Sequence, residues 1–214
     1  MDYADARKRM VDGQLRPNKV TDPRLLEALR ELPRERFVPP AVQVRAYADE
    51  EVPLPGGRAL MEPMILARLL QLAGVRPGDR ALVLGAGTGY GAAVLARIGA
   101  RVVAVEEDAG LLAIARTALA ACLPAGAVRL ETGSPVRGYP GGAPYDVVLI
   151  EGEIPEVPPA IAEQLAEGGR LVGVLRGGRA VLGQRLGGGF TATPAFDCRA
   201  APLPAFAETV GFVF

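Results

Sequence analysis

Histidine and tryptophan are absent from this sequence, and cysteine occurs only twice. The lack of imidazole excludes the common Ser-His and Cys-His nucleophile pairs and every histidine metal site. The two cysteines, Cys122 and Cys198, do not have the spacing of metal ligands, so we expect free thiols and no bound metal. An enzyme of this composition must rely on carboxylates, tyrosine and small hydroxyl side chains, or on the positioning of its reactants.

Lysine is also scarce, because Lys8 and Lys19 are the only lysines among 24 basic residues. Aspartate and glutamate also total 24, so the formal net charge is zero and no basic field is available to hold a nucleic-acid backbone. No apolar run is long enough to cross a bilayer or to form a signal peptide, which predicts a cytoplasmic protein that works away from membranes. The sequence leaves the oligomeric state open.

The length of 214 residues and the hydrophobic content of 50% are sufficient for one sizeable core. We expect a single domain over residues 1–214. Within it, an N-terminal helical extension on the substrate side, 1–75, precedes an α/β core, 76–214. In the extension, Pro63 suits the first turn of a helix, and Gly74 suits its end.

From residue 80 onward, short apolar segments alternate with helical patterns. This alternation predicts an α/β fold with a doubly wound, mostly parallel sheet and helices on both faces. Glycine pairs separate the last two segments, which we expect to form antiparallel strands. The expected strands are 81–84, 101–105, 128–131, 146–150, 170–175, 181–186 and 190–195. The expected core helices end at 98, span 111–121 and span 159–166, with a turn at 167–169.

The most informative segment is ALVLGAGTGYGAAVLA, residues 81–96, in which an apolar strand leads directly into glycines that open a helix. Gly85, Gly87 and Gly89 leave room for a ligand to press against the backbone. The free N–H groups at the start of the helix favour a polar or anionic part of that ligand. Because Gly87-x-Gly89-x-x-Ala92 also satisfies the dinucleotide pattern, the glycines do not separate the two classes of nucleotide-like cofactor.

Glu106 ends the second expected strand, where a carboxylate can accept hydrogen bonds from both hydroxyls of an adenosyl ribose. An alternative is that the acids of segment 106–108 only cap the next helix. Because the carboxyl ends of parallel strands share one edge of a sheet, the loops 132–135 and 151–155 belong to the same candidate site. Glu151 is therefore either directed at a ligand or a solvated loop acid.

Several segments resemble the protein-L-isoaspartate O-methyltransferase family. They are MV at 10–11, QLR at 14–16, LPRERFVP at 32–39, AYAD at 46–49, LGAGTGYGAAVLA at 84–96, and YP through APYD at 139–146. The resemblance implies a Rossmann-like methyltransferase fold, S-adenosylmethionine as cofactor and Glu106 as its ribose ligand. It also implies a protein or peptide substrate whose isoaspartyl carboxylate attacks the sulfonium methyl group, a reaction that needs positioning more than a general base.

The chain departs from the family pattern on both sides of this site. The family's substrate-handling threonine and serine correspond to Ala59 and Met61, which carry no hydroxyl, and Arg58 precedes them. Ser134 occupies the place of an aspartate near the adenine. The loop 151–155 is acidic and is expected to repel a carboxylate substrate unless an arginine such as Arg58 neutralises it.

The candidate site combines acceptor-side and cofactor-side positions. They are Arg58, Ala59 and Met61 on the acceptor side, and Gly85, Ala86, Gly87, Thr88, Gly89, Tyr90, Glu106, Glu107, Gly133, Ser134 and Glu151 on the cofactor side. Two alternatives remain open on the sequence. One is a divergent relative that methylates another acceptor, or that only binds S-adenosylmethionine or S-adenosylhomocysteine as a regulatory module. The more remote one is an NAD(P)-dependent oxidoreductase.

Overall fold

A computed structural model describes residues 2–207, and its centre is a seven-stranded sheet of order β5-β4-β3-β6-β7-β8-β9. The five strands from β5 to β7 in that order are parallel, while β8 and β9 continue the sheet as antiparallel strands. This arrangement confirms the expected α/β fold with an antiparallel C-terminal part. The strands are β1 Val52–Pro53, β2 Ala59–Leu60, β3 Arg80–Leu84, β4 Arg101–Glu106, β5 Val128–Thr132, β6 Tyr145–Ile154, β7 Leu165–Leu175, β8 Arg179–Leu186 and β9 Gly189–Asp197.

The helices begin and end at residues that suit those positions. At the start of α2 the Asp22 side chain accepts hydrogen bonds from the next backbone N–H groups, and at the end of α3 Gly74 adopts a left-handed conformation with φ of 56°. Pro63 opens α3, as the sequence predicts. The helices are α1 Tyr3–Met10, α2 Pro23–Glu31, α3 Pro63–Ala73, α4 Tyr90–Arg97, α5 Ala109–Cys122 and α6 Pro159–Ala162.

Successive side chains of the central strands point to opposite faces of the sheet and enter two apolar cores. In β3, Ala81 and Val83 belong to the first core, and Leu82 and Leu84 belong to the second. The first core also takes in side chains of α2, α3, α4 and α5, and the second is closed by α6 and the C-terminal end of the described chain. Long helices therefore cover one face, and shorter elements cover the other.

The expected helix over 159–166 is too long, because α6 ends at Ala162 and the chain enters β7 at Leu165. The pairing of Leu165 with Tyr145 of β6 satisfies backbone groups that a longer helix would have kept. The expected turn at 167–169 is instead an irregular stretch within β7, where the register to β6 shifts and Gly168 has a φ of 75°.

The fourth expected strand is too short at its carboxyl end. β6 continues beyond residue 150 to Ile154, because its last residues pair with Val174 and Leu175 of β7. Glu151 therefore lies within β6, in the irregular stretch between Leu149 and Glu153 where the register to β7 shifts, and its exposure of 7% rules out the solvated loop acid.

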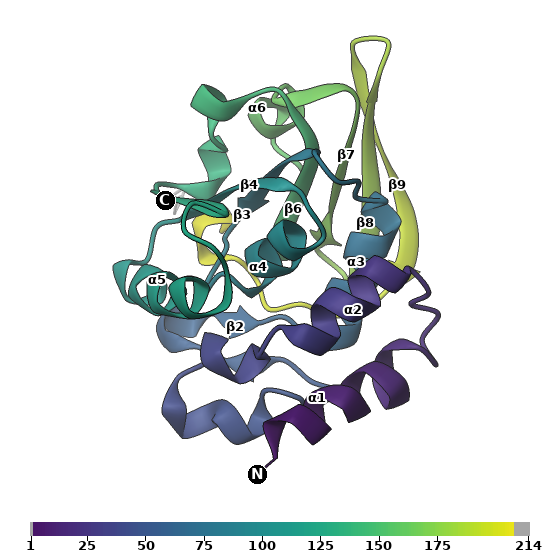
Figure 1. The fold of residues 1–214 in the computed structure, drawn as a ribbon. Coiled ribbons are helices and arrows are strands. Elements are labelled where there is room, and N and C mark those ends of the chain that lie inside the picture. The colour runs from purple at the N-terminus through teal and green to yellow at the C-terminus, as the bar shows by residue number, and fades with distance from the viewer. Residues whose placement is uncertain (1, 208–214) are drawn as a thin grey trace, which may run out of the picture.

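The helix α2 packs on the first face of the sheet, where Glu31 pairs with Arg97 at the end of α4 and Arg24 donates to the Val75 carbonyl ahead of β3. Figure 1 shows α1 in purple at the end of the molecule opposite to the tip of the long β8–β9 hairpin. The β8–β9 turn lies beside the amino end of β7, since Gln184 pairs with Arg170 while Arg179 pairs with Leu175. No helix in the described range 2–207 is both long and apolar enough to span a membrane.

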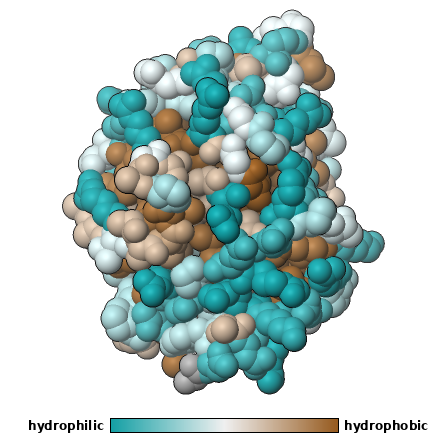
Figure 2. All heavy atoms as spheres, viewed as in Figure 1, coloured by the Kyte–Doolittle hydropathy of each residue, from teal (hydrophilic) through white to brown (hydrophobic). Residues whose placement is uncertain are grey.

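The outer surface of the N-terminal helices is polar and charged. Figure 2 shows hydrophilic side chains gathered over the lower part of the face where Figure 1 places α1 and α2. Ion pairs join many of these charges, including Arg9 with Asp5 and Arg30 with Asp12. Exposed pairs of this kind contribute about 0–1 kcal/mol each, so most of the stability comes from the two apolar cores.

Candidate functional site

The glycine loop joins β3 to α4 at the carboxyl edge of the sheet. Gly85, Gly87 and Gly89 have φ angles of 64°, 54° and 86°, which residues with a side chain adopt only at a cost. The Ala86 N–H donates to the carbonyl of Val105 at 3.1 Å, which fixes the loop against the end of β4. The glycines are thus required by the turn itself as well as by any ligand that approaches it.

Glu106, the last residue of β4, is fully buried and points its carboxylate at this loop. Its Oε2 accepts from the Gly87 N–H at 2.7 Å and from Nη1 of Arg58 at 2.8 Å. Its Oε1 accepts from the backbone N–H groups of Glu107 at 2.9 Å and Asp108 at 3.1 Å. Capping of α5 is done by Asp108, which accepts from the Leu111 N–H at 2.9 Å. Glu106 therefore belongs to the glycine loop and not to a helix cap.

Arg58 lies over the loop from the turn that joins β1 to β2. Besides Glu106 it reaches the carbonyl oxygen of Gly85, at 2.6 Å from Nη2, and 8% of its side chain is exposed. Gly56 and Gly57 precede it with φ angles of 68° and 69°, and together they form the tight turn that places the guanidinium. The arginine expected on the acceptor side thus contacts the cofactor side directly.

The C-terminal end of the described chain also covers the glycine loop. Pro202 lies beside Glu153 at the end of β6 in a parallel bridge, and hydrogen bonds between the backbones of 153, 201 and 203 hold the segment there. The Leu203 side chain, 3% exposed, contacts Gly85 and Gly152, where a Cβ atom would approach it within 3 Å. A ligand that binds at Gly85 therefore has to displace the Leu203 side chain, and the backbone can stay in place.

Glu151 sits behind the loop against the first turn of α4. A Cβ on Gly91 would overlap its carboxyl group, so the glycine makes the space that the carboxyl fills. Burial raises the pKa of Glu151 to about 8, although the positive charges of Arg58 and Arg34 and the Gly91 N–H oppose the shift. The negative charge of Glu106 adds to the rise. Near neutral pH this carboxyl is therefore largely protonated.

Arg34 is a fully buried cation that interacts electrostatically with Glu151, and it lies on the 3-10 helix Arg34–Phe37. Its Nε donates to the Ala46 carbonyl and its Nη2 to the Met61 carbonyl, both at 2.6 Å. Its guanidinium lies 4.8 Å from the centre of the Tyr90 ring. Burial lowers the pKa of Arg34, whereas the neighbouring Glu151 raises it. The arginine thus joins the segment around Met61 to the start of α4.

Within the described chain, several buried polar atoms around the glycine loop and α4 have no hydrogen-bond partner, which indicates whether a polar ligand fits there. Among residues 2–207, five buried side-chain nitrogen or oxygen atoms lack a hydrogen-bond partner, and four of them surround the glycine loop and α4. They are Nη1 of Arg34, Oγ1 of Thr88, the hydroxyl of Tyr90 and Oε1 of Glu151. Buried polar atoms are rarely left unpaired, so a ligand or water fits this edge. These atoms offer donors and acceptors to a ligand that carries polar groups.

The remaining sequence-predicted residues lie around this centre. Met61 is 2% exposed and packs in the first core, while Ala59 is half-buried in β2. The Gly133 N–H donates to the carbonyl of Glu106 at 3.1 Å, which brings the loop of Ser134 to the end of β4. Glu107 is exposed. All the predicted loops therefore converge on one edge, with Glu106 at its centre.

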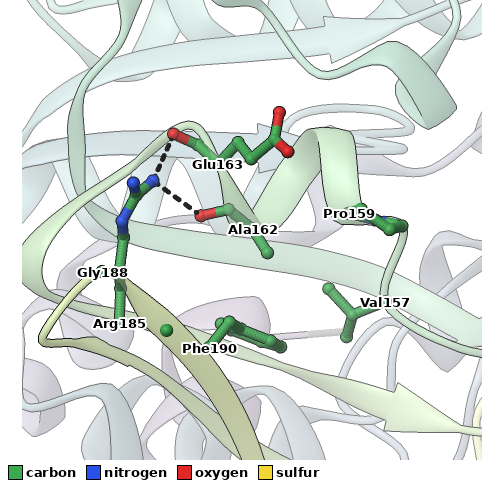
Figure 3. Close-up of a pocket in the computed structure, with 8 residues that line it drawn as sticks. Val157, Pro159, Ala162, Glu163, Arg185, Gly188 and Phe190 are labelled. Carbon is green, nitrogen blue, oxygen red and sulfur yellow. Dashed lines mark hydrogen bonds between the residues drawn. The ribbon is translucent and has the colours of Figure 1, made fainter.

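A separate hollow of about 270 Å³ lies between α6 and the β8–β9 turn, away from the glycine loop. Figure 3 shows Arg185 there, directed at the carbonyl oxygens of Ala162 and Glu163, to which it donates hydrogen bonds. Phe190 and Val157 supply an apolar floor. Because the Arg185 donors shown are engaged by the backbone, we assign no chemistry to this hollow.

Sequence reasoning missed three residues that shape the site. Arg34 lies in a segment of mixed charge that gives no sign of full burial. Gly91 is one of many glycines, and its role depends on the carboxyl group opposite it. Leu203 lies more than 100 residues from the loop it covers, and no local pattern reveals that contact.

Comparison with known proteins places these features in context. A family model described as protein-L-isoaspartate(D-aspartate) O-methyltransferase matches residues 6–182. The protein-L-isoaspartate O-methyltransferase of Methanoregula boonei is 44% identical over 180 residues, which cover 83% of this chain and 81% of the relative. That of Methylorubrum populi is 44% identical over 167 residues, 78% of each chain.

Solved structures give the same result. A protein-L-isoaspartate O-methyltransferase superposes with a TM-score of 0.79 at 27% identity, over 92% of this chain. The present chain spans only 65% of that longer protein. A Plasmodium falciparum protein described as a putative protein-L-isoaspartate O-methyltransferase, in complex with S-adenosylhomocysteine, superposes with a TM-score of 0.78 over 93% of this chain and 98% of its own length. At 18% identity, this second likeness concerns the fold.

Proposed function

This chain belongs to the protein-L-isoaspartate(D-aspartate) O-methyltransferase family, and we propose that it methylates the carboxylate of isoaspartyl residues in proteins or peptides. It is an enzyme of the S-adenosylmethionine-dependent class, and S-adenosylmethionine is its cofactor. The family membership resolves the ambiguity of the glycine pattern against a nicotinamide dinucleotide. The observation that carries the assignment of the site is the Glu106 carboxylate, fully buried and bonded to the Gly87 N–H.

We assign cofactor binding to the residues around that carboxylate. Gly85, Gly87 and Gly89 let a ligand approach the backbone, and the positive dipole end at the start of α4 suits a polar or anionic group of that ligand. Glu106 would hold the ribose hydroxyls. When bound, S-adenosylmethionine supplies an electrophilic methyl group on a sulfonium. The chain itself then has to orient an acceptor toward this group and exclude water.

The acceptor is already ionised, so its activation requires no base and is compatible with a sequence without histidine. What it requires is positive charge, and Arg34 and Arg58 provide it at this edge. Glu151 adds little repulsion at neutral pH, because its raised pKa of about 8 keeps the carboxyl largely protonated. A protonated carboxyl can also donate a hydrogen bond, as the hydroxyls missing at Ala59 and Met61 would.

The direct test is transfer of tritiated methyl groups from S-adenosylmethionine to a pair of peptides that share one sequence. One peptide carries an isoaspartyl residue and the other a normal aspartyl residue at the same position. We expect a base-labile methyl ester on the isoaspartyl peptide alone. Binding of S-adenosylmethionine by calorimetry without transfer to either peptide would instead favour a relative with another acceptor or a binding role.

We also propose the cytoplasm as the compartment in which the protein works. Cys122 and Cys198 are both free and partly buried, and burial raises the pKa of each thiol. Free thiols persist in a reducing compartment. The proposal would fail if fractionation of cells that express the natural gene recovered the protein outside the cytoplasm.

A further inference from the structure

The Glu106 carboxylate has no free acceptor position in this structure. It accepts four hydrogen bonds, from Arg58 and from the backbone N–H groups of Gly87, Glu107 and Asp108. A carboxylate offers about four lone-pair sites, so the four donors use all of them. Ribose hydroxyls can therefore bind Glu106 only if one of the present donors leaves.

Arg58 is the donor that can leave. The other three donors are backbone groups of the glycine loop and of the turn into α5, and their positions are fixed by the sheet and the helix. The guanidinium sits at the end of a flexible side chain, in a turn whose two glycines have positive φ. Only 8% of the side chain is exposed, so the pair is closed off from water while it lasts.

We propose that Arg58 is a two-position residue that couples the binding of cofactor and acceptor. In the position seen in the structure it closes the ribose site by bonding to Glu106 and to the Gly85 carbonyl. When the ribose takes its place, the released guanidinium binds the acceptor's carboxylate. This inference rests on the proposed function, since it needs both S-adenosylmethionine and an anionic acceptor.

The acceptor half of the proposal follows from charge and position. Arg58 directly precedes Ala59, which has no hydroxyl with which to meet a carboxylate. Arg34, the other cation of the region, is fully buried and bonded to the carbonyls of Ala46 and Met61, so it cannot move far. A released Arg58 has lost the Glu106 charge that balanced it, and an incoming carboxylate would replace that charge. Arg58 is thus the cation available to an acceptor.

The first test is calorimetric titration of S-adenosylhomocysteine into the wild type and Arg58→Ala. Without the Arg58 side chain, which competes with the ribose for Glu106, the affinity for S-adenosylhomocysteine should rise by about tenfold. The apparent affinity of a ligand is lowered in proportion to the fraction of molecules whose site is closed. Arg58→Lys should lie between the two, since an ammonium cannot span Glu106 and the Gly85 carbonyl together. The Arg58→Lys variant also provides the test if Arg58→Ala fails to fold.

Arg170→Ala is the matched control. Arg170 is also partly buried, and it also bonds to one carboxylate, Asp79 at 2.8 Å, and to backbone carbonyls, those of Gly74 at 3.0 Å and Asp146 at 3.3 Å. It lies outside the cofactor site, so its loss should leave the affinity for S-adenosylhomocysteine unchanged. A similar tightening in both variants would show a general effect of lost ion pairs and would overturn the proposal.

The second test is the affinity for an isoaspartyl peptide, measured by fluorescence anisotropy with and without saturating S-adenosylhomocysteine. In the wild type, saturating S-adenosylhomocysteine should increase the affinity for the peptide by about fivefold or more. In Arg58→Ala this coupling between the two ligands should vanish. Equal or weaker binding of S-adenosylhomocysteine by Arg58→Ala, or undiminished coupling, would overturn the role of Arg58 and leave the cofactor assignment intact. Absence of S-adenosylhomocysteine binding by every protein, including the wild type, would instead overturn the proposed function.

Discussion

The carboxyl group of Glu151 occupies the space that a side chain at position 91 would fill. Gly91 lies in the first turn of α4, and a Cβ atom there would overlap the Glu151 oxygen and press on Leu149 at 3.1 Å. Glycine is a poorer helix former than alanine, by about 1 kcal/mol in a helix interior, so a glycine here does not favour the helix by itself. The two residues therefore form one unit, in which the glycine makes a buried carboxyl possible.

Replacement of Gly91 by alanine should destabilise the protein by about 1–3 kcal/mol, because the new methyl group overpacks the space beside Glu151. In a Glu151→Ala background the same change should cost little or be favourable, since alanine is the better helix former. Urea unfolding of the wild type, both single variants and the double variant measures the coupling. Additive free energies of unfolding would contradict the proposed dependence of one residue on the other.

The stability of the protein should fall as pH rises through the titration range of Glu151. The pKa of its carboxyl is raised from 4.5 to about 8 by burial, so between these values the folded state holds a proton that the unfolded chain has lost. The free energy of unfolding then decreases with pH by up to about 1.4 kcal/mol per unit, and the decrease ends above pH 8. The free energy of unfolding of Glu151→Gln should lack this pH dependence, so it should rise relative to that of the wild type between pH 6 and pH 8.5. Parallel stability profiles of the two proteins would contradict the buried, protonated carboxyl.

Substitution of Gly87 by alanine should weaken the binding of S-adenosylhomocysteine by about tenfold or more, because a methyl group stands where the ligand meets the backbone. The protein itself has room for this group, since its nearest neighbours would be 3.8 Å away. Gly74→Ala is the matched control, because Gly74 has nearly the same φ, 56° against 54°, and a Cβ there meets nothing within 4 Å. Both variants should lose about 1–2 kcal/mol of stability to backbone strain. Equal loss of affinity in both would contradict a ligand at the glycine loop.

Restoration of the missing hydroxyls should raise the rate of methyl transfer to an isoaspartyl peptide. The double variant Ala59→Thr, Met61→Ser adds donors beside the acceptor, and one well-placed donor contributes about a hundredfold in rate. Met61 is 2% exposed, so its replacement should also cost about 2–5 kcal/mol of stability. Ala59→Val, which has the shape of threonine without its hydroxyl, should give no gain. Failure of the double variant to exceed the wild type at saturating S-adenosylmethionine would show that these positions do not act on the acceptor.

The sequence predicts the convergence of the site because the carboxyl ends of parallel strands meet at one edge. The glycine loop, Glu106 and the loop of Ser134 could therefore be placed together from local patterns alone. The burial of Arg34 and Glu151 could not, because it depends on which distant segments pack against them. The boundaries of α6 and β7 were missed for a similar reason, since the pairing of Leu165 with Tyr145 overrides a helical pattern.

The most direct measurement is a crystal structure of the protein grown with S-adenosylhomocysteine. We expect both ribose hydroxyls within hydrogen-bonding distance of the Glu106 carboxylate, and the Arg58 guanidinium away from Glu106 and turned toward the acceptor side. A ribose bound elsewhere, with the ion pair between Arg58 and Glu106 intact, would contradict the account of this site.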